Sequence, residues 1–499
     1  MNSIWNKNIS LLKKRFPQLT LLLKSEIDRF NSFAGTEQQA ALHPFWNISN
    51  SKSGELTVSE NNLKLHSAYS PKKEAQSIVN SKKETLRNAK SVVFMAFGLG
   101  YSVLECIKNF PLLPVLIVEP EPKRFFAAML YLDWQDFFQK QNITLAVGCT
   151  PDQVIKLISI NGFEKSVFIS VAAQKKHAEE YFSVLQTLID RNISKEKINQ
   201  ATLKKLGKLW KNNIEKNYDF VKKLDGVEIY KEDAKDIPFF LIAAGPSLQG
   251  ALKFLSKIKK RGIVVCVDTA LKACLQAKIE PDFVVLTDPQ YWAYRHIANL
   301  KSPSSVLITE VAVYPSVFRW PCRKIVACKS QVRIQDYSKY CMPEKGDLGS
   351  GGSVASSAWN FCVFCGAKQI FTLGLDFSFP RKQTHISGSS FEQAVHSTST
   401  RIKPAETASM PLLFSGNVSL EKNYFGKPVL TDQKMKMFAW WFESRIQQVP
   451  DVKTFSLFGE GLHIPGIKPC NLNEILSLPE IESLKKDFFK KSEKKQNRN

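Results

Sequence analysis

Residues 239–289 decide the fold, and they read FFLIAAGPSLQGALKFLSKIKKRGIVVCVDTALKACLQAKIEPDFVVLTDP. Three short apolar runs alternate here with segments of helical periodicity, which predicts strands and helices in turn. In a parallel sheet the ends of such strands share one edge, where α/β folds bind ligands. A glycine turn before a helix also suits a phosphate, although a ligand-free turn has the same composition. The strand ends are Gly245-Pro246-Ser247, Asp268-Thr269 and Asp288-Pro289.

The same alternation continues beyond this stretch. Further apolar runs at 305–309, 324–327 and 369–373 predict a doubly wound parallel sheet, and therefore an α/β fold class. A chain of 499 residues is long enough for two or three domains. The predicted parts are a helical and irregular segment (1–85), a smaller Rossmann-like domain (86–172), a helical linker (173–234), a central domain (235–400), a mostly helical C-terminal part (401–485) and a basic disordered tail (486–499).

The predicted Rossmann-like domain carries its own glycine turn. The apolar run at 91–97 leads into Gly98-Leu99-Gly100, and a second run ends at Glu119, 21 residues after Gly98. This is the layout of a dinucleotide-binding unit, in which the acidic residue holds a ribose. The third glycine of that signature is absent. A scaffold without a cofactor therefore explains the pattern as well as a working site does.

The composition limits the class of protein. Hydrophobic residues make up 44% of the chain, which excludes global disorder. The 69 Lys and Arg residues outnumber the 46 Asp and Glu residues, giving a formal net charge of +23. This charge favours acidic partners such as nucleotides or sugar acids, although a basic surface also aids solubility. Because the lysines are spread over predicted helices, we expect no nucleic-acid partner.

The cysteines and the N-terminus indicate the cellular compartment. The ten cysteines are scattered, many of them in apolar runs, which is typical of reduced thiols in a cytosolic protein. Cys362 and Cys365 form a single CxxC within a helical pattern, and we interpret them as packing residues rather than metal ligands. No apolar run reaches the ~18–20 residues of a membrane span. We therefore expect a cytoplasmic protein without a transmembrane segment, and the sequence singles out no metal-ligating residue.

Two further features belong to the central domain. Gly349-Ser350-Gly351-Gly352-Ser353-Val354 precedes a predicted helix, and this composition suits an anion, although a flexible connector would have it too. Asp376 follows the apolar run at 369–373 and is another acidic strand end. The polar segment 387–410, which comes after His385, is predicted to be a mobile loop.

These motifs together resemble the Maf family, the motility accessory factors regarded as flagellin glycosyltransferases. The resemblance rests on AAGPSL at 243–248, residues 267–289 and 349–379, and KQTH at 382–385. HSAYSP at 66–71, GLG at 98–100 and VEPEP at 118–122 match the N-terminal half of that family. The central domain is similar in turn to bacterial sialyltransferases.

The resemblance implies transfer of a nonulosonic acid, of the pseudaminic or legionaminic type, from a CMP-sugar to Ser or Thr of flagellin. Such transfer serves flagellar assembly and motility, and it needs no cofactor beyond the donor. The implied partners are therefore flagellin and the CMP-nonulosonic acid. The resemblance places the 245–247 turn at the CMP phosphate of the donor. The full set of donor-binding candidates is Gly245, Pro246, Ser247, Asp268, Thr269, Gly351, Gly352, Ser353 and Val354.

One departure affects the acceptor side. The sialyltransferases carry a general-base His in the loop that here reads YFGKPVLTDQ, at 424–433, and contains no His. His385 is the candidate base, because it lies in a loop after Asp376, at the rim of the site. Asp288 and Glu310 are alternative carboxylates at strand ends.

Other functions fit the same fold. A related archaeal domain that resembles residues 243–379 is a pterin pyrophosphokinase, for which Asp268 and Asp288 would hold Mg²⁺ with ATP. The Gly98–Gly100 turn mildly suggests a methyltransferase. A non-catalytic flagellin-binding accessory protein is the third alternative.

Overall fold

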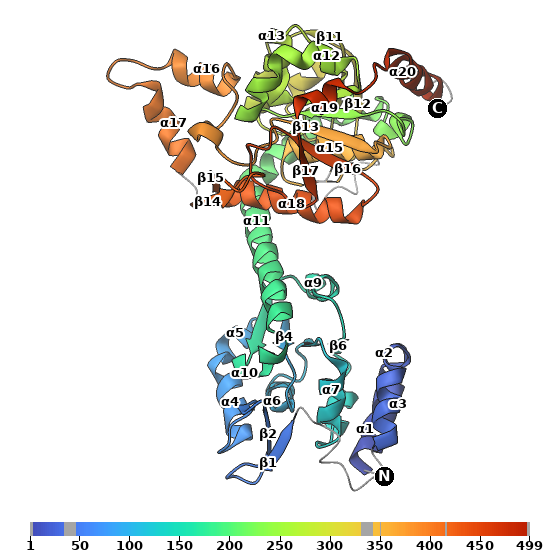
Figure 1. The fold of residues 1–499 in the computed structure, drawn as a ribbon, viewed down its shortest axis with the longest axis vertical. Helices are drawn as coiled ribbons and strands as arrows, with labels where there is room; N and C mark the ends of the chain where they lie inside the picture. Colours follow the sequence, from blue (N-terminus) through green and yellow to red (C-terminus); the bar gives the residue numbers. More distant parts are fainter. Residues whose placement is uncertain (1–2, 34–45, 331–342, 350, 415–416, 497–499) are drawn as a thin grey trace. The chain divides into compact units, whose positions relative to one another are not determined.

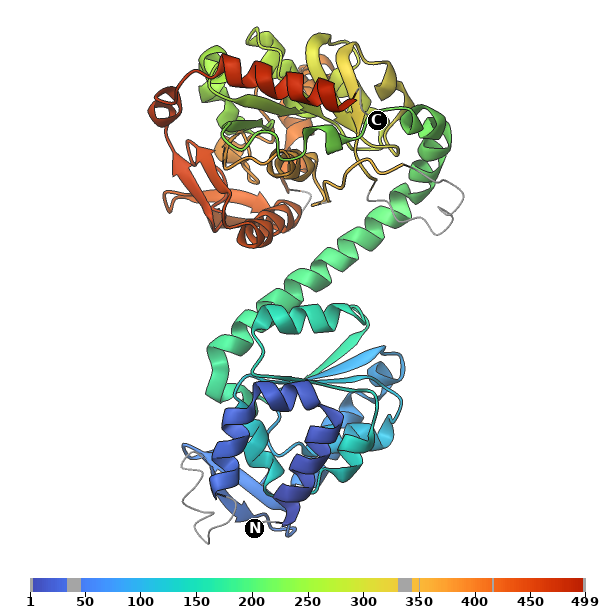
Figure 2. The same ribbon diagram turned by 90° about the vertical axis from the view of Figure 1, so that its right-hand side faces the viewer.

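The computed structural model describes residues 3–33, 46–330, 343–349, 351–414 and 417–496 (Figures 1 and 2). The chain divides into two compact units, Met1–Gln200 and Ala201–Asn499, here called the N-terminal and the C-terminal unit. The long helix α11, Glu179–Lys222, begins in the first and ends in the second. It occupies most of the predicted helical linker.

The N-terminal unit is built on a parallel four-stranded sheet of order β6-β5-β4-β7. The strands are short and mostly buried on both faces, as the apolar runs predict. The predicted Rossmann-like arrangement is therefore present. Its elements are β4 (Ser91–Met95), α6 (Tyr101–Asn109), β5 (Val115–Glu119), α7 (Pro122–Met129), α8 (Gln135–Gln139), β6 (Ile143–Val147), α9 (Pro151–Ser159), β7 (Ser166–Ser170) and α10 (Ala172–Lys175).

Residues 1–85 are not a separate segment, in contrast to the predicted boundary. Trp5 is fully buried, with its ring 6.2 Å from that of Phe126 in α7, and the Asn8 amide donates to the Met129 carbonyl at 2.7 Å. These residues share the core of the four-stranded sheet. The elements are α1 (Ser3–Arg15), α2 (Pro17–Leu22), α3 (Lys24–Phe33), the antiparallel strands β1 (Asn47–Asn50), β2 (Leu56–Glu60) and β3 (Leu63–Lys64), α4 (Pro71–Ser81) and α5 (Lys83–Arg87).

The C-terminal unit contains the predicted doubly wound sheet. Eight parallel strands have the order β12-β11-β10-β9-β8-β13-β16-β17. The chain winds outward from β8 to β12, returns to β13, and then winds the other way, so the topological switch lies between β8 and β13. The strands are β8 (Phe239–Ile242), β9 (Ile263–Val267), β10 (Phe283–Val285), β11 (Ser302–Thr309), β12 (Cys322–Ala327), β13 (Gln369–Leu373), β16 (Lys453–Leu457) and β17 (Ile467–Cys470).

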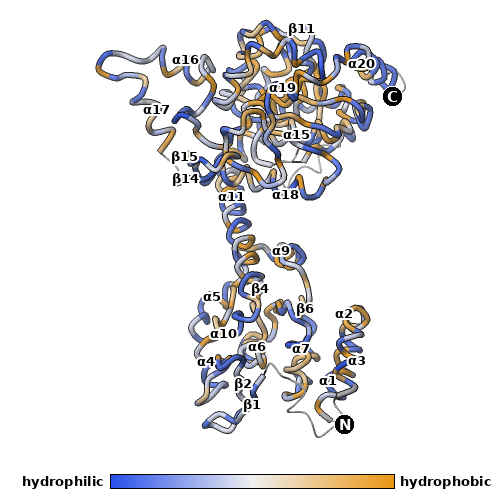
Figure 3. The backbone as a smooth tube through the Cα atoms, in the orientation of Figure 1, coloured by the Kyte–Doolittle hydropathy of each residue, from blue (hydrophilic) through white to orange (hydrophobic). Residues whose placement is uncertain are grey.

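Helices cover both faces of this sheet. The connections between β8 and β12 contain α12 (Leu255–Lys259), α13 (Leu271–Gln276) and α14 (Tyr291–Ile297). The crossover back to β13 is α15, Val354–Phe364, which by the right-handed rule lies on the opposite face. Figure 3 shows the hydrophobic stretches of this unit gathered around the strands and α15.

The C-terminal part is less helical than predicted, because β16 and β17 extend the sheet across the expected boundary at residue 400. The tail is helical rather than disordered up to Gln496. In α20, Glu482–Gln496, the ring centroid of Phe488 lies 5.6 Å from that of Tyr230, and Phe488 is 1% exposed. Residues 387–410 include α16 (Ser390–Ser397) and part of α17 (Ala405–Phe414), which extend away from the sheet in Figure 1. The other elements are β14 (Val418–Lys422), β15 (Pro428–Asp432), α18 (Gln433–Gln448) and α19 (Leu472–Leu476).

The cysteines form no disulfide within the described residues, in agreement with the composition. Cys362 lies in α15 and Cys365 directly follows it, and both are buried. Burial raises the pKa of both thiols. The CxxC pair is therefore an inert part of the core, as predicted.

Two asparagines of α11 hold the loops at the carboxyl edge of the sheet. The Asn217 amide donates to the carbonyls of Val311 and Val313 at 2.9 and 2.8 Å. One turn earlier, Asn213 donates to the carbonyls of Pro289 and Ala312, both at 2.9 Å. Both side chains are buried. Each amide thus satisfies two carbonyls in segments that follow β10 and β11.

We predict that Asn217→Ala lowers the free energy of unfolding by about 1–3 kcal/mol, because two buried carbonyls lose their donor. The measurement is the melting temperature by circular dichroism. Lys216→Ala, an exposed neighbour on the same helix, is the control and should melt like the wild type. Equal melting temperatures for the two variants would contradict the clamping role.

Candidate functional site

The two loops at the topological switch are joined directly. Ser247, in the turn after β8, donates its backbone N–H to Asp376 Oδ2 at 2.9 Å and its hydroxyl to Asp376 Oδ1. The Gly245 N–H donates to the Gly374 carbonyl at 2.8 Å. The structure therefore brings together two predicted regions that are 129 positions apart in the sequence. Both donors of Ser247 are engaged with Asp376.

This junction requires glycine and a buried carboxylate. A Cβ at Gly245 would lie 2.5 Å from Asp376 Oδ2, so no other residue fits there. Asp376 is 5% exposed, and burial raises its pKa to about 6, although hydrogen bonds from Ser247 oppose the shift. Arg381 adds a bond from Nη2 to the Pro246 carbonyl at 3.0 Å. Asp376 thus positions the 245–247 turn and is ionised near pH 7.

The next strand end carries a buried carboxyl group, one oxygen of which has no hydrogen bond in the described residues. Asp268 follows β9 and is 3% exposed, and its Oδ1 has no hydrogen bond within the described residues. Burial, and then the charge of Asp288, raise the pKa of Asp268 to about 8. Asp288 itself accepts a hydrogen bond from the Gln290 N–H at 2.8 Å. Thr269, beside Asp268, is partly buried.

The Gly351–Val354 segment begins α15 at the same edge, since a helix that leads into β13 runs antiparallel to the strands. Ser353 is the N-cap, and its Oγ accepts from the Ser356 N–H at 3.3 Å. A Cβ on Gly352 would lie 3.0 Å from the Phe438 ring, whose centroid is 6.2 Å from that of Phe377. Gly352 and the residue after Asp376 therefore contact the same side chain of α18.

His385 lies over the end of β8. The next residue, Ile386, donates its N–H to the Ala244 carbonyl at 2.8 Å. The His385 ring stacks on Phe391 at 4.2 Å, and Nδ1 lies 3.1 Å from Thr384 Oγ1. Burial, and then His296, lower the pKa of His385 to about 4, so the imidazole is neutral at pH 7. With the proton on Nδ1, the Nε2 atom is an acceptor without a protein partner in the described part of the chain.

His296 belongs to this group, although the sequence did not indicate it. It lies in α14, with Nδ1 2.8 Å from Ser390 Oγ and its ring 4.7 Å from that of Phe391. Burial lowers the pKa of His296, while Asp288 opposes the shift. An isolated histidine in a short helix gives no signal of this contact, because Ser390 and Phe391 are 94 or more positions away.

Glu310 lies apart from these residues. It follows β11, three strands from β8, which corresponds to roughly 14 Å at the usual strand spacing. Glu310 is buried, and burial of the Cys328 thiol and then the charge of Glu310 raise the pKa of Cys328. The structure therefore groups it with the outer strands rather than with His385.

The Gly98–Gly100 turn of the N-terminal unit is filled by side chains. The Leu99 N–H donates to His66 Nε2 at 2.8 Å. A Cβ on Gly100 would lie 2.0 Å from the Trp134 ring. Glu119, the predicted ribose ligand, is 3.0 Å from His177 Nε2 and accepts from the backbone N–H of Phe97. This arrangement favours a scaffold without a cofactor.

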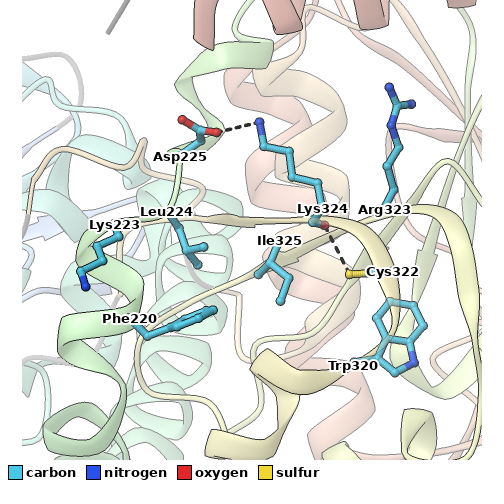
Figure 4. A pocket seen from close by; sticks show the side chains of 9 residues that line it. All are labelled: Phe220, Lys223, Leu224, Asp225, Trp320, Cys322, Arg323, Lys324 and Ile325. Atoms are coloured by element: carbon cyan, nitrogen blue, oxygen red, sulfur yellow. Dashed lines mark hydrogen bonds and ion pairs between the residues drawn. The ribbon is translucent and has the colours of Figure 1, made fainter. Parts of the chain in front are cut away.

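A hollow of about 370 Å³ lies elsewhere in the C-terminal unit (Figure 4). It is formed by the end of α11 and the first residues of β12, and it contains the ion pair between Lys324 and Asp225 at 2.6 Å. The beginning of a strand is the edge opposite to the one where α/β sheets bind ligands. None of the predicted site residues lines it. The lining residues are Phe220, Lys223, Leu224, Asp225, Trp320, Cys322, Arg323, Lys324 and Ile325.

Comparison with known proteins finds similarities for both units. Residues 31–169 match the family model of the glycosyltransferase Maf N-terminal domain. The fold is similar to that of a Maf glycosyltransferase from Magnetospirillum magneticum AMB-1, with a TM-score of 0.65, 14% identity and coverage of 99% of this chain and 78% of that one. The chain has the Maf N-terminal domain and the Maf fold. The family resemblance predicted from the motifs is confirmed.

Other similarities cover parts of this Maf chain. Residues 212–382 match the family model described as 6-hydroxymethylpterin diphosphokinase MptE-like. Two proteins of Treponema pallidum (strain Nichols), both described as uncharacterized, are also similar. One is 34% identical over 40% of this chain and 59% of its own length. The other is 22% identical over 51% of this chain and 85% of its own length.

Two further findings concern membrane-spanning helices and clusters of metal-binding side chains. No helix in the described residues is long and apolar enough to cross a membrane. The same residues hold no group of three or more His, Cys, Asp or Glu side chains placed to bind a metal ion. Asp268 and Asp288 are near enough to interact electrostatically, because the charge of Asp288 contributes to the raised pKa of Asp268.

We predict that Asp268→Asn raises the melting temperature, and more so at pH 8 than at pH 5. The folded-state pKa of Asp268 is raised to about 8, so its favourable contribution is complete below the ordinary pKa and is lost as the pH rises towards 8. Asparagine does not ionise and avoids this loss. Asp236→Asn, at an exposed carboxylate of the same unit, is the control. A difference that does not widen with pH would contradict the burial of an uncompensated carboxyl group.

Proposed function

We propose that this protein is a glycosyltransferase that moves a nonulosonic acid from a CMP-activated donor to Ser or Thr of flagellin, in support of flagellar assembly and motility. The observation that carries the proposal is His385, a neutral imidazole whose Nε2 has no partner in the described residues, located at the topological switch of the sheet. The Maf N-terminal domain and the Maf fold support glycosyl transfer. The motif resemblance supports the choice of donor and acceptor.

The reaction requires two contributions from the protein. The CMP phosphate leaves as the bond to the sugar breaks, so its charge needs stabilisation in the transition state. The acceptor hydroxyl must lose a proton as it attacks. His385 Nε2 takes this proton in our proposal. Asp376 is a positioning residue, because its oxygens are occupied by Ser247.

Backbone amides at the start of α15 suit the phosphate. The first amides of a helix have no acceptor within the helix. Ser353 satisfies the N–H of Ser356, which leaves those of Val354 and Ala355 for a ligand. This helix has 11 residues, and its positive end favours an anion. The 245–247 turn contributes its shape, and Thr269 its hydroxyl.

We predict that His385→Ala lowers kcat for transfer at least about 100-fold while leaving CMP affinity within a factor of about three, because a general base contributes to the chemical step. Purified enzyme, CMP-sugar and unmodified flagellin give the rate by intact-protein mass spectrometry. His396→Ala, an exposed histidine of α16, is the control and should retain wild-type kcat. Wild-type turnover by His385→Ala would place the base elsewhere.

The same variant tests the accessory-protein alternative. In cells that lack this protein, a plasmid carrying His385→Ala or Asp376→Asn should restore neither flagellin mass nor motility, provided that the variants accumulate normally. Full motility with unmodified flagellin would favour a non-catalytic role. The filled Gly98–Gly100 turn gives the methyltransferase alternative no support.

A pyrophosphokinase is the second candidate, favoured by the MptE-like match and by the neighbouring carboxylates Asp268 and Asp288. Thermal stability separates the two proposals, since a ligand that binds the folded state raises the melting temperature by mass action. We predict a shift with CMP in the absence of metal. A shift with ATP and Mg²⁺ but none with CMP would favour the pyrophosphokinase.

A further inference from the structure

The side chain of Lys272 is partly buried, and its ammonium group is shielded from solvent without a hydrogen-bond partner in the described residues. Lys272 is the second residue of α13 and follows the turn 268–270 at the end of β9. Burial lowers the pKa of Lys272. A buried, unpaired ammonium is unfavourable for folding, so its presence needs a reason outside the folding of the chain.

The surroundings of Lys272 are those of the candidate site. Gln276 lies one turn further along α13 and on the same helical face. A Cβ built on Gly388 would lie 3.5 Å from Gln276 Oε1, so the loop that follows His385 covers this face. That loop is joined to the end of β8 through the bond from Ile386 to Ala244. Lys272 thus lies on the face of α13 that looks toward the His385 loop.

Asp268 supplies a second unpartnered group, four residues before Lys272. Its Oδ1 is buried without a hydrogen bond, as described above. Asp268 and Lys272 form no ion pair with each other, and Lys272 Nζ has no hydrogen-bond partner in the described residues. A ligand that accepts hydrogen bonds and carries negative charge would satisfy both the ammonium and a protonated carboxyl group.

We propose that Lys272 Nζ binds a phosphate oxygen of the nucleotide that occupies the carboxyl edge of the sheet. This inference rests on the proposed function for the identity of the nucleotide, CMP, but not for the phosphate itself. The raised pKa of Asp268 supports it, because a neutral carboxyl group beside the phosphate donates a hydrogen bond instead of repelling the anion. Lysine suits this role as a point charge on a flexible stem.

The test compares stability and affinity in one variant, Lys272→Met, which keeps the length of the side chain and removes its charge. If Lys272 serves a ligand, the ligand-free variant melts at or above the wild-type temperature, while its affinity for CMP falls about tenfold or more. Affinity for cytidine, which has no phosphate, stays within about twofold. Lys257→Met, at an exposed lysine of α12, is the control and should match the wild type in all three measurements.

The outcomes separate this inference from the proposed function. Equal loss of CMP and cytidine affinity, unchanged CMP affinity, or a lower melting temperature of the ligand-free variant would overturn the role of Lys272. If the wild type binds ATP rather than CMP and Lys272→Met weakens ATP binding about tenfold, Lys272 is a phosphate ligand and the CMP donor is wrong. A wild type that binds neither CMP nor ATP nor inorganic pyrophosphate would overturn both.

Discussion

The hydrogen bonds from Ser247 to Asp376 are the constraint on which the candidate site depends. They join the loops after β8 and β13, the two strands between which the sheet changes its direction of winding. At such a switch the flanking helices leave the sheet on opposite faces, and an open crevice results. A buried carboxylate that accepts two hydrogen bonds fixes the separation of the loops. His385 and the start of α15 are placed relative to this junction.

Several groups near this junction are unfavourable for the stability of the folded chain. In the described part of the chain, Asp268 Oδ1 and Lys272 Nζ are shielded from solvent without hydrogen-bond partners. Phe377, next to Asp376, has a φ of 45°, a conformation that is unfavourable for a bulky side chain. Unfavourable features at the ligand-binding edge of a well-packed sheet are consistent with a site where a ligand supplies the missing interactions. The proposals for His385 and Lys272 both start from this observation.

The sequence predicts this edge better than it predicts the surroundings. Short, uninterrupted apolar runs with small or acidic ends identify β8, β9, β10 and β13, because buried parallel strands leave a continuous apolar signal. Strand β17 lacks that signal, since its exposed and buried positions are mixed. His296 and Lys272 could not be selected from the sequence. His296 is distinguished by its contacts, and Lys272 by the lack of a partner for its ammonium group in the described residues. A chain with 69 Lys and Arg residues also offers too many candidate cations.

The two glycine turns of this chain show why such motifs need a structure. Both follow a buried strand and precede a helix, yet Gly98–Gly100 is closed by His66 and Trp134, which lie more than 30 positions away in either direction. No local pattern records which distant side chain fills a turn. At Gly245, the carboxylate of Asp376 holds the turn and does not fill the edge of the sheet. The Lys272 ammonium has no hydrogen-bond partner in the described residues. The Gly98–Gly100 turn is filled by side chains of the protein itself, whereas the edge of the sheet beside the 245–247 turn is where we propose that an anion binds.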